Sequence, residues 1–144
     1  MSTLIAFILI SIFLFLVGIH VYWAFGGKWG ENSVIPTTNQ EEKAVMPGII
    51  PTLIVALGFL CFAFIVLVDV TEISTNMPAW LTLIYRYGLW VIAGIFILRS
   101  IGDFRYIGFF KKIKDTPFGK SDTKYFSPLC LLIGLLALTL RLII

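Results

Sequence analysis

Residues 4–25 read LIAFILISIFLFLVGIHVYWAF, an apolar run without a single Asp, Glu, Lys or Arg. A helix needs about 20 such residues to cross the hydrocarbon core of a bilayer. Three more apolar runs follow at residues 52–70, 83–101 and 126–140, with polar breaks between them. Runs of this length are unusual in a small soluble domain. We therefore expect an all-α membrane protein with four antiparallel transmembrane helices.

The composition agrees with this expectation. Of the 144 residues, 59% are hydrophobic and only 13% are charged, whereas about 25% of the residues in a soluble domain are charged. The excess of apolar side chains is explained if lipid surrounds most of them. No polar stretch is long enough for a second domain, so residues 1–144 are expected to form one four-helix bundle.

The basic residues predict how this bundle is oriented. Four spans place both termini on one side of the membrane, and the connections after the first and third spans on the other side. Nine Lys and Arg residues lie in or beside these two connections, against two on the side of the termini, Arg86 and Arg141. Because basic residues concentrate in cytoplasmic loops, we expect two cytoplasmic loops, N- and C-termini outside, and a location in the inner (cytoplasmic) membrane.

Several residues predict local details of the spans. Pro51 is expected in the first turn of the second span, where its missing N–H costs nothing, and Ser127 is expected to be the N-cap of the fourth. Cys61 and Cys130 lie at different depths, which favours buried free thiols over a disulfide. Small residues inside spans allow close helix packing. Five glycines are candidates for such contacts: Gly18, Gly58, Gly88, Gly94 and Gly134.

Polar and aromatic side chains gather at the expected cytoplasmic ends of the spans, where each polar group needs a partner or a function. His20 and Trp23 share one helix face, and nearby glycines let Trp29 fold back under the bundle. Arg99 and Asp103 are one helical turn apart and are expected to form an ion pair. A third group surrounds Asp122. The candidate ligand-binding residues are His20, Trp23, Trp29, Arg99, Asp103 and Arg105.

Three strings in these groups carry a resemblance to a known family. They are HVYWAFGGKWG at residues 20–30, RSIGDFRYIGFFKK at residues 99–112 and YFSPLC at residues 125–130. Together they resemble a bacterial family of small four-helix membrane proteins of unknown function, over nearly the whole chain. The resemblance implies a four-span fold. It implies no activity, cofactor or catalytic residue.

Specific chemistries find little support in the sequence. One histidine and two separated cysteines make no recognisable metal site, and no motif of a nucleophilic or phosphate-binding enzyme occurs. We therefore predict no catalytic residue, no metal and no cofactor. The basic loops are explained by membrane orientation, so nucleic acid is not an expected partner. The expected partners are membrane lipids with anionic headgroups at the cytoplasmic face, and a protein partner or a second copy of the chain.

The leading functional hypothesis is a non-enzymatic protein with a pocket at the cytoplasmic side for an anionic amphiphile or a partner helix. Arg99 and Arg105 would supply positive charge, and Asp103 would orient one of them. The two tryptophans would cover the apolar part, and His20 would form a hydrogen bond. One alternative is a structural subunit of a membrane complex. Another is a membrane-embedded enzyme that acts on a lipid or quinone, with His20 or Asp103 transferring the proton.

Overall fold

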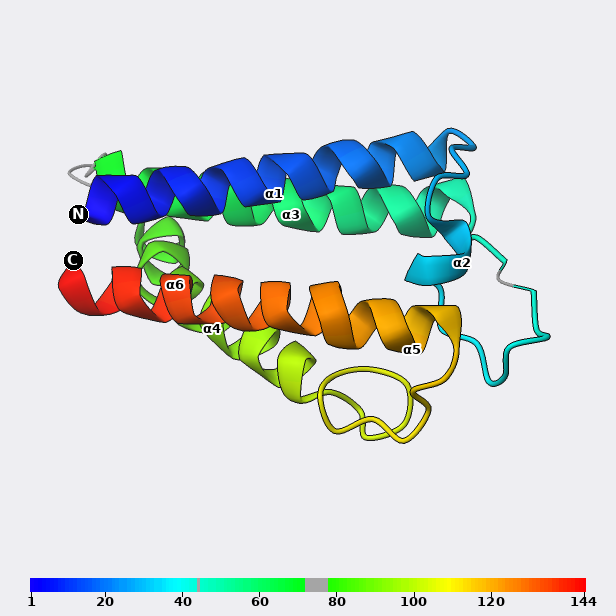
Figure 1. Cartoon of the computed structure of the whole chain (residues 1–144). Helices are drawn as coiled ribbons and strands as arrows, with labels where there is room; N and C mark the ends of the chain where they lie inside the picture. The colour runs from blue at the N-terminus through cyan, green and yellow to red at the C-terminus, as the bar shows by residue number, and fades with distance from the viewer. Residues whose placement is uncertain (44, 72–77) are drawn as a thin grey trace.

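The structure is a computed structural model that describes residues 1–43, 45–71 and 78–144 (Figure 1). Over these residues all regular elements are helices, and four of them are long. The long helices are α1 (Ser2–Ala24), α3 (Ile49–Thr71), α4 (Ala79–Ile101) and α6 (Ser127–Ile143). The short elements are α2 (Glu31–Val34), α5 (Pro117–Ser121) and the π-helical turn η2 (Asp122–Phe126).

Within the part of the chain that the structure describes, four helices are long and apolar enough to cross a membrane, as predicted. The first three agree closely with the predicted runs, and Pro51 lies in the first turn of α3. The fourth differs, because α5, η2 and α6 continue without a break and the apolar helix spans Pro117–Ile143. The prediction that Ser127 caps this helix is therefore wrong: Ser127 has helical dihedral angles, φ −66° and ψ −43°. The wider π turn ends at Phe126, two residues before Pro128, whose ring and missing N–H disturb a regular α-turn.

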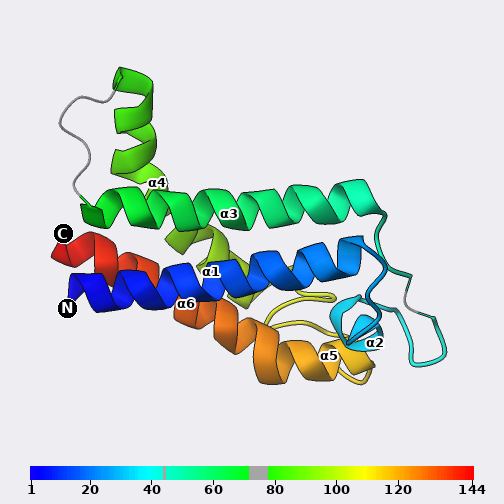
Figure 2. The same cartoon turned by 90° about the horizontal axis from the view of Figure 1, so that it is seen from above.

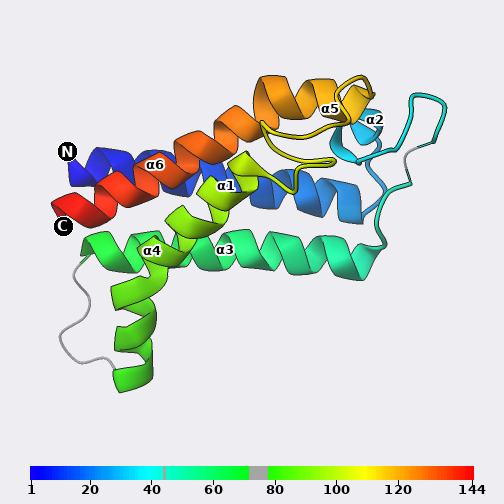
Figure 3. The same cartoon turned by 90° about the horizontal axis from the view of Figure 1, so that it is seen from below.

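The helices form two pairs, α1 with α3 and α4 with α6. Figure 1 shows both termini at one end, and α2, α5 and the long connections at the opposite end. Gln40 and Asp115 join these two connections directly, because the Gln40 side-chain amide donates to the Asp115 carbonyl at 3.1 Å. The two long connections therefore share one end of the molecule. Figures 2 and 3 show that the first half of α4 points away from the other helices.

The centre of the bundle is an aromatic cluster. Phe13 of α1 packs against Phe62 of α3 and Phe96 of α4, with ring centroids 5.7 and 5.8 Å apart. Phe13 itself is fully buried. The outer faces are apolar as well: Phe7 and Phe15 of α1 are 68% and 66% exposed. Large exposed hydrophobic faces on every long helix fit an environment of lipid rather than water.

Two of the five span glycines make the close contacts that were predicted. A Cβ atom on Gly88 would lie 2.5 Å from Cγ2 of Ile65, and one on Gly134 would lie 2.7 Å from Cγ1 of Ile97. These contacts bring α4 onto α3 and α6 onto α4. The other three have open space within 4 Å of such a Cβ: Gly18, Gly58 and Gly94.

Candidate functional site

A cavity of about 250 Å³ lies between the four long helices, toward the end that carries the long connections. We call it the interhelix cavity. Its wall is largely aromatic and aliphatic, with polar groups at a few points only. Among the residues that line it are His20, Trp23, Phe96, Arg99, Cys130 and Ile133. Ligand sites in proteins have this character, an apolar wall with a few polar groups that orient the ligand.

His20 and Trp23 are held together on α1, as their spacing predicted. Their rings meet edge to face with centroids 5.2 Å apart. The Nδ1 atom of His20 donates to the carbonyl of Leu16 at 2.7 Å. Because that bond occupies the Nδ1 proton, Nε2 is the ring nitrogen that remains for a ligand.

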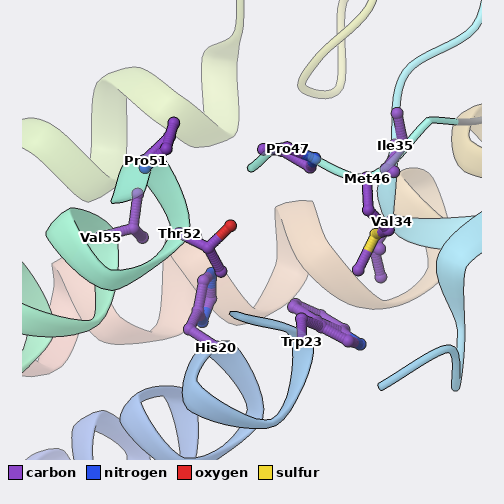
Figure 4. Close-up of a pocket in the computed structure, with 9 residues that line it drawn as sticks. All are labelled: His20, Trp23, Val34, Ile35, Met46, Pro47, Pro51, Thr52 and Val55. Carbon is purple, nitrogen blue, oxygen red and sulfur yellow. The ribbon is translucent and has the colours of Figure 1, made fainter. Parts of the chain in front are cut away.

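The same two residues line a second, smaller cavity of about 180 Å³ between α1, the start of α3 and the segment before it. Figure 4 shows His20 beside Thr52, and Trp23 on the side of Met46 and Val34. His20 and Trp23 thus form a shared wall between the two cavities.

Trp29 contributes to this region through its backbone. The indole N–H of Trp23 donates to the Trp29 carbonyl at 2.8 Å, so the chain does return toward α1 as expected. The Trp29 side chain, however, is 69% exposed. It lines neither of the two cavities.

Arg99 lines the interhelix cavity, but its partner is not the predicted one. Its Nη2 atom donates to Oδ1 of Asp122 at 2.8 Å. The expected ion pair with Asp103 is absent among the described residues, because α4 ends at Ile101 and Gly102 turns the chain with φ +95°. Arg99 and Asp103 are therefore not one turn apart on a helix, and the prediction that rested on this spacing is wrong. The Nη1 atom of Arg99 is buried and has no hydrogen-bond partner within the described part of the chain.

Asp122 is the centre of a buried polar group that we call the Asp122 cluster. The carboxylate is fully buried, and its Oδ2 accepts hydrogen bonds from Gly108 N at 2.8 Å, Lys111 Nζ at 2.9 Å and Ser127 Oγ at 3.0 Å. With Arg99 on Oδ1, five residues make up the cluster: Arg99, Gly108, Lys111, Asp122 and Ser127. The π turn explains one of these contacts, because residues i and i+5 lie about 140° apart around a regular α-helix. The wider turn brings Asp122 and Ser127 together.

Membrane orientation and lipid headgroups were the explanation for the basic residues of the two connections, and for Lys111 this explanation is wrong. Its side chain is fully buried and its ammonium group reaches three oxygens. They are the Gly108 carbonyl at 2.9 Å, the Asp122 carboxylate at 2.9 Å and the Thr123 hydroxyl at 2.6 Å. A three-proton ammonium group is satisfied by three acceptors.

Asp103 and Arg105 lie outside the cavity, on the exposed loop after α4. Oδ1 of Asp103 accepts the N–H groups of Arg105, Tyr106 and Ile107 at 2.9, 2.7 and 2.9 Å. These hydrogen bonds, that of Ile107 first, hold the pKa of the Asp103 carboxyl below its ordinary value, because they stabilise the charged form. The Arg105 guanidinium lies over the Tyr106 ring, 5.0 Å from its centroid. The structure therefore gathers three of the six predicted site residues in the interhelix cavity and leaves the other three outside.

Sequence reasoning missed the roles of Lys111, Asp122, Ser127 and Cys130. Cys130 lines the cavity and Cys61 is exposed on α3; both are free thiols, but the expectation that Cys61 is buried is wrong. One signal for Asp122 was available. A carboxylate inside an apolar helix needs a cation, and a fourth span extended toward its N-terminus beyond the predicted 126–140 would have included Asp122.

These features define a class: a helical bundle with four helices that are long and apolar enough to cross a membrane, which fits a multi-pass membrane protein. Residues 13–137 match the family described as "Protein of unknown function (DUF3995)". The match extends over most of the chain, and the chain belongs to this family. Neither the curated proteins nor the solved structures contain a match to it. The expected membership of a family without a known function is confirmed.

Proposed function

We propose that the protein is a non-enzymatic inner-membrane protein that holds an anionic amphiphile in the interhelix cavity. The observation that carries the proposal is the buried Nη1 atom of Arg99, which has no partner among the described residues and belongs to a residue of the cavity wall. An unsatisfied buried polar group costs about 1–3 kcal/mol, and more when it is charged. The Arg99 side chain is 29% exposed, so a small shift of the guanidinium would let an anionic oxygen of a ligand reach Nη1 and remove this cost.

The rest of the wall suits a hydrocarbon chain. Phe59 and Phe96 supply aromatic surface, and Leu129 and Ile133 supply aliphatic surface. A volume of about 250 Å³ lies near the lower limit of roughly 300–1,000 Å³ for small-molecule sites. That volume accommodates a segment of one narrow chain, such as an acyl or isoprenoid chain.

The orientation is part of the proposal: antiparallel spans, both termini outside, and the two long connections in the cytoplasm. The excess of Lys and Arg near these connections supports it. The shared position of the two connections supports it too, because Gln40 of one contacts Asp115 of the other. The cavity would then open toward the inner leaflet, with Arg99 at headgroup depth.

The proposal is tested by filling the cavity. Cys130→Phe places a ring in the cavity wall, whereas Cys61→Phe places the same ring on the exposed face of α3. We expect Cys130→Phe to weaken binding of a dansyl-labelled fatty acid to the purified full chain by at least about tenfold, the equivalent of ~1.4 kcal/mol. Cys61→Phe should bind it like the unchanged protein.

Thermal unfolding in the same detergent shows whether both variants fold. Equal binding by two folded variants would contradict the proposal. If Cys130→Phe does not fold, Arg99→Met carries the test, because it removes the charge and retains most of the side-chain length. Unchanged binding by Arg99→Met would overturn the role of the guanidinium.

The structural-subunit alternative is favoured by one observation. Gly18 on α1, Gly58 on α3 and Gly94 on α4 face open space, where the backbone of another helix is able to approach closely. Chemical cross-linking in native membranes, before and after substitution of Gly18 by Leu, tests this second function. A cross-linked partner that disappears in Gly18→Leu would support it, and an unchanged pattern would contradict it.

The enzymatic alternative loses one of its two proposed proton carriers. Asp103 is exposed and uses Oδ1 to bind three backbone N–H groups of its own loop. His20 stays in the cavity wall, but among the described residues that line the cavity there is no carboxylate. Asp122 is fully buried and paired with Arg99 and Lys111. Binding without turnover is the function that this arrangement favours.

A further inference from the structure

The Asp122 cluster has an unequal charge balance. Two cations, Arg99 and Lys111, surround a single carboxylate, and that carboxylate is fully buried. One positive charge is therefore left over. Lys111 and Asp122 are fully buried and the Arg99 side chain is only 29% exposed. An unbalanced charge at such a site is costly, so it favours a further partner.

The hydrogen bonds show where the surplus charge is located. Both Asp122 oxygens are occupied, Oδ1 by Arg99 and Oδ2 by three donors. The Lys111 ammonium has three acceptors and is satisfied. Arg99 alone in the cluster keeps a buried nitrogen without an acceptor in the described residues. The surplus charge is therefore presented by Arg99, the member of the cluster that lines the interhelix cavity.

From this balance we infer that the Asp122 cluster selects a singly charged headgroup, a phosphodiester or a carboxylate, over a doubly charged phosphomonoester and over a neutral headgroup. The inference rests on the proposed function. A single negative charge neutralises the cluster and supplies the missing acceptor. A second negative charge would have no cation in the cavity wall, and a neutral headgroup would leave the surplus in place.

In this arrangement Asp122 is a positioning residue. It holds the Arg99 guanidinium through Nη2 at 2.8 Å and keeps the second cation, Lys111, at 2.9 Å on its other oxygen. Lys111 acts on the ligand through this shared carboxylate. Without Lys111, Asp122 would neutralise Arg99 fully and the cavity would lose its surplus charge.

The test compares lipids with identical acyl chains on the full chain in detergent micelles, by displacement of the dansyl-labelled fatty acid. The probes are phosphatidylglycerol, phosphatidic acid, diacylglycerol and an unlabelled fatty acid. A pH of about 8 keeps a phosphomonoester doubly charged and an ordinary imidazole uncharged. Phosphatidylglycerol carries its single charge on a phosphodiester and the fatty acid carries it on a carboxylate. Comparing the two shows which of these groups the cluster binds.

We expect phosphatidylglycerol, the fatty acid or both to bind at least about tenfold more tightly than diacylglycerol, as for a charge-assisted hydrogen bond. Phosphatidic acid should bind no more tightly than phosphatidylglycerol. Tighter binding of phosphatidic acid by tenfold or more would overturn the inference. Equal binding of all four lipids would overturn both the inference and the proposed preference for an anionic amphiphile, whereas tighter binding of phosphatidic acid would overturn the inference alone. Failure of every lipid to displace the probe would refute the proposed function itself.

Two neighbouring lysines supply a matched pair of variants. Lys111→Met removes the buried charge, and Lys112→Met removes an exposed charge one residue further along the same loop. We expect Lys111→Met to reduce the preference for phosphatidylglycerol over diacylglycerol to about twofold or less. Lys112→Met should keep the preference. The same loss of lipid preference in both variants would show a general charge effect and overturn the role of the cluster. If Lys111→Met does not fold, the lipid series on the unchanged protein tests the inference.

Discussion

Asp103 and Asp122 both hold the loop between α4 and α5 in place, but Asp103 closes a turn within the loop in water, whereas Asp122 joins the loop to the helices away from water. Asp103 is exposed and accepts three backbone N–H groups. Asp122 is fully buried and binds two cations, a hydroxyl group and a backbone N–H. The difference shows that the surroundings decide what a carboxylate contributes. In water it closes a turn, and in the bundle it holds charges that would otherwise be unpaired.

The largest expected effect is that of Asp122→Ala, which leaves the fully buried Lys111 and the partly buried Arg99 without their anion. Breaking a buried ion pair costs about 3–5 kcal/mol. We expect a marked fall in Tm of the purified protein, measured by thermal unfolding in detergent. Asp115→Ala removes an exposed carboxylate close by and should change the stability by less than about 0.5 kcal/mol. Similar effects of the two substitutions would contradict the importance of burial.

Gly108→Ala is expected to have an intermediate effect at the point where the loop meets the cluster. Gly108 has φ +89° and donates its N–H to Asp122, and a Cβ atom there would collide with the Ile101 carbonyl. Backbone strain costs about 1–3 kcal/mol, and the collision adds to it. Gly26→Ala is the control, because Gly26 also has φ +89° but faces open space. We expect Gly108→Ala to lower Tm clearly more than Gly26→Ala; the reverse order would contradict the close approach.

Asp103→Asn is expected to have the smallest effect, at most about 1 kcal/mol near neutral pH, because solvent screens an exposed carboxylate. The pKa of Asp103 is lower in the folded protein, so its contribution is present above the ordinary value of about 3.9 and is lost as the pH falls through the folded value. Thermal unfolding from neutral to acidic pH measures it. The unchanged protein should have a higher Tm than Asp103→Asn near neutral pH, and this difference in Tm should disappear only below pH ~4. An advantage that persists in stronger acid would show that the three hydrogen bonds do not depend on the charge.

The sequence was sufficient for the elements that depend on local properties. The four apolar runs predicted the four long helices because a span requires only length and hydropathy. The shared face of His20 and Trp23 followed from helix geometry. Gly88 and Gly134 were among the predicted close contacts, but nothing in the sequence separated them from Gly18, since rotation about a helix axis depends on its neighbours.

The pairing of charges was not predictable in this way. Arg99 was assigned to Asp103 because four residues separate them, but its partner Asp122 is 23 residues away. The helix ends between Arg99 and Asp103, and the loop then folds back so that Lys111 is buried rather than facing headgroups. Long-range contacts of this kind depend on the path of the loop, which local spacing does not contain.

The sequence by itself thus determined an all-helical chain with four spans, because the number and length of apolar runs are properties of consecutive residues. The tertiary structure alone decided which cations share the buried carboxylate, that Arg99 keeps an unpaired nitrogen, and which side chains surround the cavity. Those outcomes depend on residues from separate helices that meet only when the bundle packs. A buried charge takes the partner that packing brings within reach, whatever its distance along the chain.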